Sequence, residues 1–143
     1  MEQLQLYLDD LKQTVSGVGG VLYFTAEDLY FPCEDWREPV SVVLERWVPS
    51  FLSFVQDHTD GCLLEFMDGP YWMKLSRIDS GAVTVSFFRD SCKTGKGMTV
   101  DPAELIRSVR SALRTYDRTL YQWGMPSKWT KELSVLNQLM KQV

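Results

Sequence analysis

The stretch CLLEFMDGPYWMKLSRIDSGAVTVSFFR, residues 62–89, decides the fold. It holds three runs rich in β-forming residues, which are separated by DGP at 68–70 and by DSG at 79–81. Both separators have the composition of tight turns. In the second and third runs apolar side chains alternate with more polar ones, which is typical of strands with one buried face. The sequence therefore predicts a three-stranded antiparallel meander.

The segments that flank the meander carry further patterns. Apolar residues recur at intervals of three and four over 40–55, and a similar spacing predicts a short helix over Glu2–Thr14. The run VLYF at 21–24 predicts a strand because it is rich in β-forming residues. After the meander, DP at 101–102 predicts the start of a helix, since aspartate caps helices and proline suits the first turn. A last helix is expected after Ser127 as its cap.

In chain order these elements read α-β-α-β-β-β-α-α. We expect a single α+β domain over residues 1–143, with helices packed on one antiparallel sheet made of the meander plus one N-terminal strand. Pro49 lies inside the helix predicted over 40–55 and is expected to kink or split it. A chain of 143 residues can bury one core of normal size but not two.

Charge is distributed unevenly along the chain. The formal net charge is −4, but residues 1–90 hold 15 acids and 6 bases, whereas residues 91–143 hold 4 acids and 9 bases. A net negative chain is a poor candidate for a general nucleic-acid binder, which depends on contacts to phosphates. We therefore predict a protein partner and no nucleic acid.

The acids concentrate in residues 26–45, where aromatic side chains lie among them. One interpretation is a solvated acidic loop whose aromatic rings turn inward. The other is an acidic, aromatic surface that attracts a basic protein by its field and anchors it with its rings. The candidate partner-binding residues are Glu27, Asp28, Tyr30, Phe31, Glu34, Asp35, Trp36 and Glu38.

Four arginines form a stripe on the helix predicted after residue 101. Their spacing of three, four and four places them on the face opposite the apolar stripe of that helix. Three interpretations stay open: a solvated face, a contact for an anionic partner, or a contact for the acidic stretch of a second copy. The four residues are Arg107, Arg110, Arg114 and Arg118.

Signals for catalysis or metal binding are weak. His58 is the single histidine, and Cys33, Cys62 and Cys92 are too widely spaced to suggest a zinc site. We expect no cofactor, no metal and no catalytic residue, although a small enzyme with a cysteine-containing pocket remains an alternative. An odd number of cysteines, together with no signal peptide and no apolar run that could span a membrane, leads us to expect a cytoplasmic protein that binds no membrane.

The Trp-bearing helix over 40–55, the sequence FMDGPY at 66–71 and the closing helices after 101–102 resemble the small acidic immunity proteins of bacterial toxin systems. The resemblance implies a non-catalytic cytoplasmic inhibitor that binds and neutralises a cognate toxin domain, which would be basic if it meets the acidic stretch. In length and acidity the chain also resembles class I type III secretion chaperones, which would imply a homodimer that binds an effector segment. A monomer and a homodimer both stay open.

Overall fold

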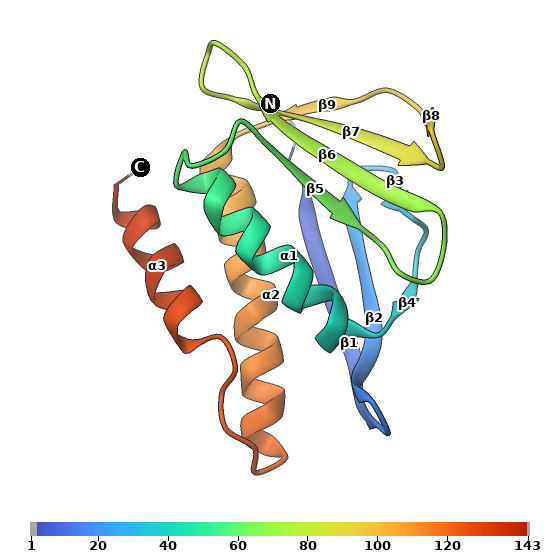
Figure 1. Cartoon of the computed structure of the whole chain (residues 1–143), viewed down its shortest axis with the longest axis vertical. Helices are drawn as coiled ribbons and strands as arrows, with labels where there is room; N and C mark the ends of the chain where they lie inside the picture. The colour runs from blue at the N-terminus through green and yellow to red at the C-terminus, as the bar shows by residue number, and fades with distance from the viewer. Residues whose placement is uncertain (1–2, 143) are drawn as a thin grey trace.

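Residues 3–142, which the computed structural model describes, form α-helices and antiparallel sheets, so the predicted α+β class is confirmed (Figure 1). One sheet contains β1 (Gln5–Thr14), β2 (Gly17–Ala26), β3 (Leu29–Phe31) and β4 (Arg37–Glu38). The other contains β5 (Gly61–Glu65), β6 (Tyr71–Arg77), β7 (Val83–Arg89), β8 (Cys92–Lys93) and β9 (Met98–Val100). The helices are α1 (Val40–Val55), α2 (Pro102–Gln122) and α3 (Thr130–Lys141).

The predicted meander is confirmed as β5, β6 and β7, and short strands β8 and β9 both pair with β7. The prediction that a single N-terminal strand joins this sheet is wrong. The N-terminal strand β2 pairs with β1, β3 and β4 in a separate four-stranded sheet. Strand β1, directly before β2 in the chain, pairs with the backbone N–H and C=O groups of β2, so these groups need no partner from the meander.

The helix predicted over 2–14 is also wrong, because most of this segment is strand β1. Leu4, Leu6 and Leu8 are buried while Tyr7 between them is exposed, which is the two-residue period of a strand. Leucines at 4, 8 and 11 fit a helical spacing equally well. Antiparallel pairing with β2 along most of the segment decides between the two patterns, and the residues of the segment taken alone do not contain that information.

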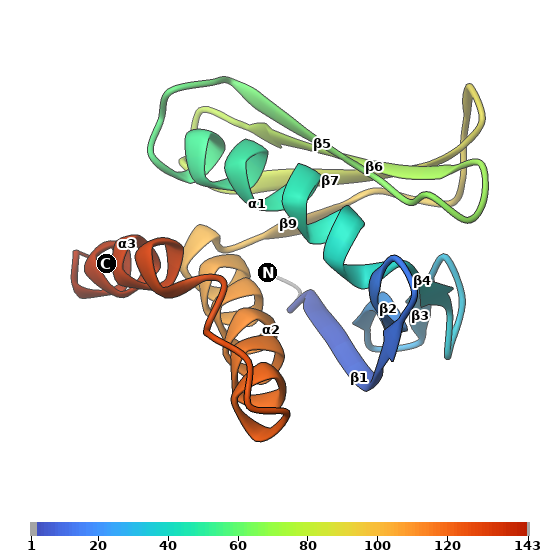
Figure 2. The same cartoon turned by 60° about the horizontal axis from the view of Figure 1, so that its bottom comes forward.

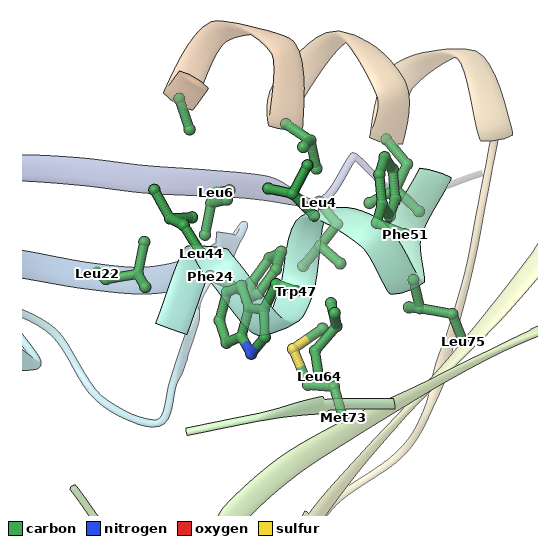
Figure 3. Close-up of a cluster of buried hydrophobic side chains, with 14 of the residues drawn as sticks. Leu4, Leu6, Leu22, Phe24, Leu44, Trp47, Phe51, Leu64, Met73 and Leu75 are labelled. Carbon is green, nitrogen blue, oxygen red and sulfur yellow. The ribbon is translucent and has the colours of Figure 1, made fainter. Parts of the chain in front are cut away.

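Helix α1 lies between the two sheets, with the meander on one side and the four-stranded sheet on the other (Figures 1 and 2). Its apolar stripe faces both, and Trp47 stands between Phe24 of β2 and Leu64 of β5 (Figure 3). The helix continues through Pro49, so the predicted split does not occur. Pro49 is exposed and so is Glu45, whose carbonyl loses its hydrogen-bond partner on the solvated side of the helix.

The two C-terminal helices pack against each other, and α2 also covers β1. Asp101 caps α2 as predicted, because its carboxylate accepts a hydrogen bond from the Ala103 N–H at 2.9 Å. The predicted cap of α3 by Ser127 is wrong. The buried carboxylate of Asp117 accepts the N–H groups of Lys128 at 2.9 Å and of Trp129 at 3.0 Å, and α3 begins directly after them.

Candidate protein-interaction surface

Three tyrosines stand side by side on the four-stranded sheet, one on each of three neighbouring strands. Tyr7 lies opposite Tyr23 in the β1–β2 register, with ring centroids 5.0 Å apart, and Tyr23 lies 6.0 Å from Tyr30 of β3. Alternation along the strands sets this arrangement. The neighbouring residues Phe24 and Phe31 point into the core, so Tyr23 and Tyr30 point to the opposite face of the sheet.

The ladder formed by these three tyrosines presents aromatic surface to solvent. The side chains at its two ends, Tyr7 and Tyr30, are each 42% exposed, and between them they help to cover Tyr23, which is buried. Tyrosine is favoured in interfaces because it contributes a rigid apolar ring and a polar hydroxyl at low entropic cost. The three rings therefore form a continuous platform, with two rings available to a partner.

Carboxylates lie near the platform. The Tyr7 hydroxyl donates a hydrogen bond to Asp9 Oδ2 at 3.2 Å, and that carboxylate is the main cause that raises the pKa of Tyr7. Burial is the main cause that raises the pKa of Tyr23, and the negative charges of Asp35 and Glu34 add to it. We call this surface, defined by Tyr7, Tyr23, Tyr30, Asp9, Glu34 and Asp35, the tyrosine–acid face.

The charge of the tyrosine–acid face is not neutralised by the neighbouring bases. Arg37 and Lys12 both contact Asp10, at the bulge of β1. Among residues 3–142, no salt bridge involves Asp9, Glu34 or Asp35. Three unpaired carboxylates beside exposed rings give a negative potential over an apolar platform, which suits a cationic group better than a neutral one.

Five of the eight residues predicted to bind a partner are exposed: Glu27, Asp28, Tyr30, Glu34 and Asp35. The first two lie in the turn between β2 and β3, at one end of the sheet that carries the tyrosines. The last two lie in the segment 32–36, which leads from β3 to β4. The structure therefore brings the exposed members of the predicted set to one sheet.

Phe31 lies in the interior rather than at the surface, which corrects its prediction as a partner-binding residue. Its side chain is 5% exposed, and its ring lies 4.8 Å from Phe87 and 5.8 Å from both Phe66 and Tyr71. Those three residues belong to the meander or its first turn. Phe31 thus joins the two sheets, and the acids that flank its short apolar run, at 27–28 and 34–35, concealed this role.

Glu38 is likewise buried, at 3% exposure, and has a structural role in the described chain. Its Oε1 accepts hydrogen bonds from Met67 N at 2.8 Å and from Trp36 Nε1 at 3.2 Å, and its Oε2 accepts one from Asp68 N at 3.1 Å. Trp36 is partly buried and packs edge-on against Tyr71, with centroids 5.4 Å apart. Glu38 therefore ties β4 to the turn between β5 and β6, and Trp36, just before β4, packs against β6.

The arginine stripe of α2 is mostly exposed, as predicted, but it is not entirely solvated. Arg110 and Arg114 of α2 each donate a hydrogen bond to Asn137 Oδ1 at 3.3 Å, so helix α3 lies against the middle of the stripe. Arg107 pairs with Glu104 one turn earlier. The stripe belongs to the C-terminal helices, whereas the tyrosine–acid face belongs to the first sheet.

The cysteines and the histidine do not form a cluster. Cys62 is buried, and burial raises the pKa of its thiol to about 11, which disfavours the thiolate that a nucleophile needs. His58, Cys33 and Cys92 are exposed. Within the described part of the chain, no three His, Cys, Asp or Glu side chains are close enough to hold a metal ion.

Sequence reasoning missed Tyr7, Tyr23 and Asp9, half of the tyrosine–acid face. A helix over 2–14 would have separated Tyr7 and Asp9 from the strand that carries Tyr23. The signal was present in LQLYLDD at 4–10, where leucines alternate with polar or aromatic residues. Such alternation next to a second β-forming run predicts a hairpin that would place tyrosines 7 and 23 side by side.

Comparison with protein-family models, with curated proteins and with solved structures finds no match to this chain. None of the helices formed by residues 3–142 has the length and apolar character that crossing a membrane requires.

Proposed function

We propose that this chain is a non-catalytic binding protein that docks a basic protein domain on its tyrosine–acid face, and that it acts as an immunity protein that neutralises a bacterial toxin domain. The observation that carries the proposal is the ladder of Tyr7, Tyr23 and Tyr30, bordered by carboxylates that form no salt bridge with any residue in the described part of the chain. The toxin class comes from the resemblance of the sequence to immunity proteins.

The chemistry of the face favours arginine or lysine side chains on the partner. A guanidinium that lies over the exposed ring of Tyr7 or Tyr30 gains a cation–π contact and remains within reach of a carboxylate. The carboxylates also attract a basic domain before contact, which raises the association rate. That attraction is screened over about 8 Å at physiological salt, so association is expected to slow as salt is added.

The binding chemistry can be tested with a fluorescent nona-arginine peptide, because the toxin domain itself is not identified. The double variant Glu34→Lys/Asp35→Lys should weaken binding by about tenfold or more at low salt. Tyr30→Ala should weaken it without changing the net charge. The matched control is Asp60→Lys/Asp79→Lys, which makes the same charge change at two exposed acids, one just before β5 and one in the turn between β6 and β7. Equal affinity of the reversed face and this control would remove the tyrosine–acid face from the proposal.

The neutralising role needs a separate experiment in bacteria. The proposal expects a toxin gene immediately upstream, whose product ends in a basic domain. Cells that produce that domain should grow when this chain is co-expressed, and they should stop growing when Glu34→Lys/Asp35→Lys replaces it. Failure of the wild-type chain to restore growth would contradict the immunity role, even if peptide binding is observed.

A further inference from the structure

The arginine stripe of α2 continues into an exposed aromatic residue. Tyr121 follows Arg118 by three positions, as Arg110 follows Arg107, so it extends the same face of the helix. Its side chain is 79% exposed. We call this surface, defined by Arg107, Arg110, Arg114, Arg118 and Tyr121, the basic stripe. It spans about 21 Å along the helix at 1.5 Å per residue.

The positive charge of the basic stripe has little local compensation. In residues 3–142, Glu104 is the only carboxylate that forms a salt bridge with it, through Arg107. Arg110 and Arg114 converge on Asn137 Oδ1, which carries no net charge. Burial, together with the neighbouring charges of Arg114 and Arg107, lowers the pKa of Arg110. An external group of carboxylates would therefore relieve repulsion along the stripe.

We propose that the basic stripe of one copy docks on the tyrosine–acid face of a second copy. The two surfaces are complementary: one has guanidinium groups and an exposed tyrosine, the other has unpaired carboxylates and two exposed tyrosines. Each carboxylate can accept charge-assisted hydrogen bonds from an arginine, and each exposed ring can stack under one. A second copy is favoured over nucleic acid as the occupant because it offers a local group of carboxylates beside exposed rings, whereas the dense phosphate charge of a nucleic acid is repelled more strongly by a chain of net charge −4.

This inference rests on the surface named in the proposed function and adds a regulation to it. A basic partner and a second copy would compete for the same face, so self-association holds the face covered until the partner displaces it. A closed dimer forms when the stripe of each copy docks on the face of the other. An open chain forms when the stripe of one copy docks on the face of a second copy, whose own stripe docks on a third. In either case the association depends on charge and should weaken in salt.

Sedimentation equilibrium on the whole protein tests the inference. At about 20 mM salt the wild-type mass should rise with protein concentration, and at about 500 mM salt it should return to that of the monomer. Arg114→Glu/Arg118→Glu and Glu34→Arg/Asp35→Arg should each remain monomeric at low salt. A mixture of these two variants should associate, because the first retains the tyrosine–acid face and the second retains the basic stripe. Lys93→Glu/Lys96→Glu is the control for reversed charge at exposed bases elsewhere.

Several results would overturn the inference. A wild-type chain that stays monomeric at low salt would do so, as would a dimer that persists at high salt or in both reversed variants. Binding of a nona-glutamate peptide to the stripe without self-association would replace the second copy by another acidic protein.

The nona-arginine peptide separates this inference from the proposed function. Arg114→Glu/Arg118→Glu should still bind the peptide, because its tyrosine–acid face is intact. A monomeric wild-type chain that binds the peptide would refute self-association alone. If the wild-type chain self-associates but the monomeric Arg114→Glu/Arg118→Glu variant does not bind the peptide, the proposed function alone is refuted.

Discussion

The two sheets each present a row of aromatic side chains on the face that points away from α1, yet the two rows differ in what surrounds them. On the meander, Trp72 and Phe88 stack with centroids 4.0 Å apart and planes 8° apart, and the Trp72 Nε1–H donates to the carbonyl of Asp90. On the first sheet, Tyr7 and Tyr23 are tilted by 34° and the row continues to Tyr30.

Charge separates the two rows more clearly than geometry does. In the register of the meander, Trp72 lies opposite Glu65 and Phe88 lies opposite Lys93, so charges of opposite sign flank the stack. The charged groups beside the tyrosine row are all negative: they are the carboxylates of Asp9, Glu34 and Asp35. A row with satisfied polar atoms and balanced charge stabilises its sheet, whereas a row with unpaired charge is suited to a partner.

The largest effect is expected at Phe31, which belongs to the first sheet but packs on the meander. Phe31→Ala should lower the free energy of unfolding by about 3–5 kcal/mol, because it leaves a cavity between the sheets. Tyr30→Ala, one residue earlier on the exposed face, should cost no more than about 1 kcal/mol. Urea denaturation followed by tryptophan fluorescence measures both. Similar losses at the two positions would contradict the assignment of Phe31 to the core.

Glu38→Ala should destabilise the chain by about 1.5–3 kcal/mol, since the N–H groups of Met67 and Asp68 lose a carboxylate partner. Glu34→Ala, at an exposed acid in the same segment, is the control and should change stability by less than about 0.5 kcal/mol. Chemical denaturation compares them. A loss at Glu38 as small as that at Glu34 would show that water replaces the carboxylate.

The next effect compares the two aromatic rows directly. Trp72→Ala should cost about 1–2 kcal/mol of stability through the lost stack and leave nona-arginine binding unchanged. Tyr7→Ala should have the reverse pattern, with little loss of stability and about tenfold weaker peptide binding. Thermal unfolding and fluorescence anisotropy give the two values. If Trp72→Ala also weakens binding, the meander contributes to the interaction surface.

A smaller effect concerns pH. Burial raises the pKa of Glu38 above its ordinary value, even though its hydrogen bonds act in the opposite direction. Between about pH 4.3 and the raised value, the unfolded chain has lost this proton and the folded chain retains it. The part of the stability that is linked to this proton is therefore complete below the window and is lost as pH rises through it, while the hydrogen bonds that Glu38 accepts remain. The difference in unfolding free energy between wild type and Glu38→Gln should fall with pH, and a rise would show that the hydrogen bonds dominate.

The smallest effect is the titration of Tyr7. The Asp9 carboxylate raises the pKa of Tyr7, so Asp9→Asn should lower it toward the ordinary value. Ultraviolet absorbance of the phenolate, with Tyr7→Phe to assign the signal, follows the change. Asp10→Asn is the control because Asp10 pairs with Arg37 rather than with a tyrosine. If the pKa of Tyr7 is the same in Asp9→Asn as in the wild type, the Asp9 carboxylate lies outside hydrogen-bond range of Tyr7 in solution.

The parts of the fold that could be predicted are those set by local patterns. Alternation and turn composition identify the meander, and Asp101 identifies the start of α2. The leucines of strand β1 fit both periods, so β1 is distinguished from a helix only when its alternation is considered together with the β-forming run of β2. The roles of Phe31 and Glu38 were hidden for a similar reason, since the contacts that bury them against the meander involve residues more than 25 positions away.

The anchors at Phe31 and Glu38 have a consequence for the acidic segment between them. Phe31 is fixed among the rings of the meander, and Glu38 is fixed to two backbone amides of its first turn. Glu34 and Asp35 therefore stand on a short connection whose two ends are held by buried contacts. Much of the conformational entropy that a free acidic loop loses on binding has already been lost on folding. A partner would meet carboxylates whose backbone is held in place before it arrives.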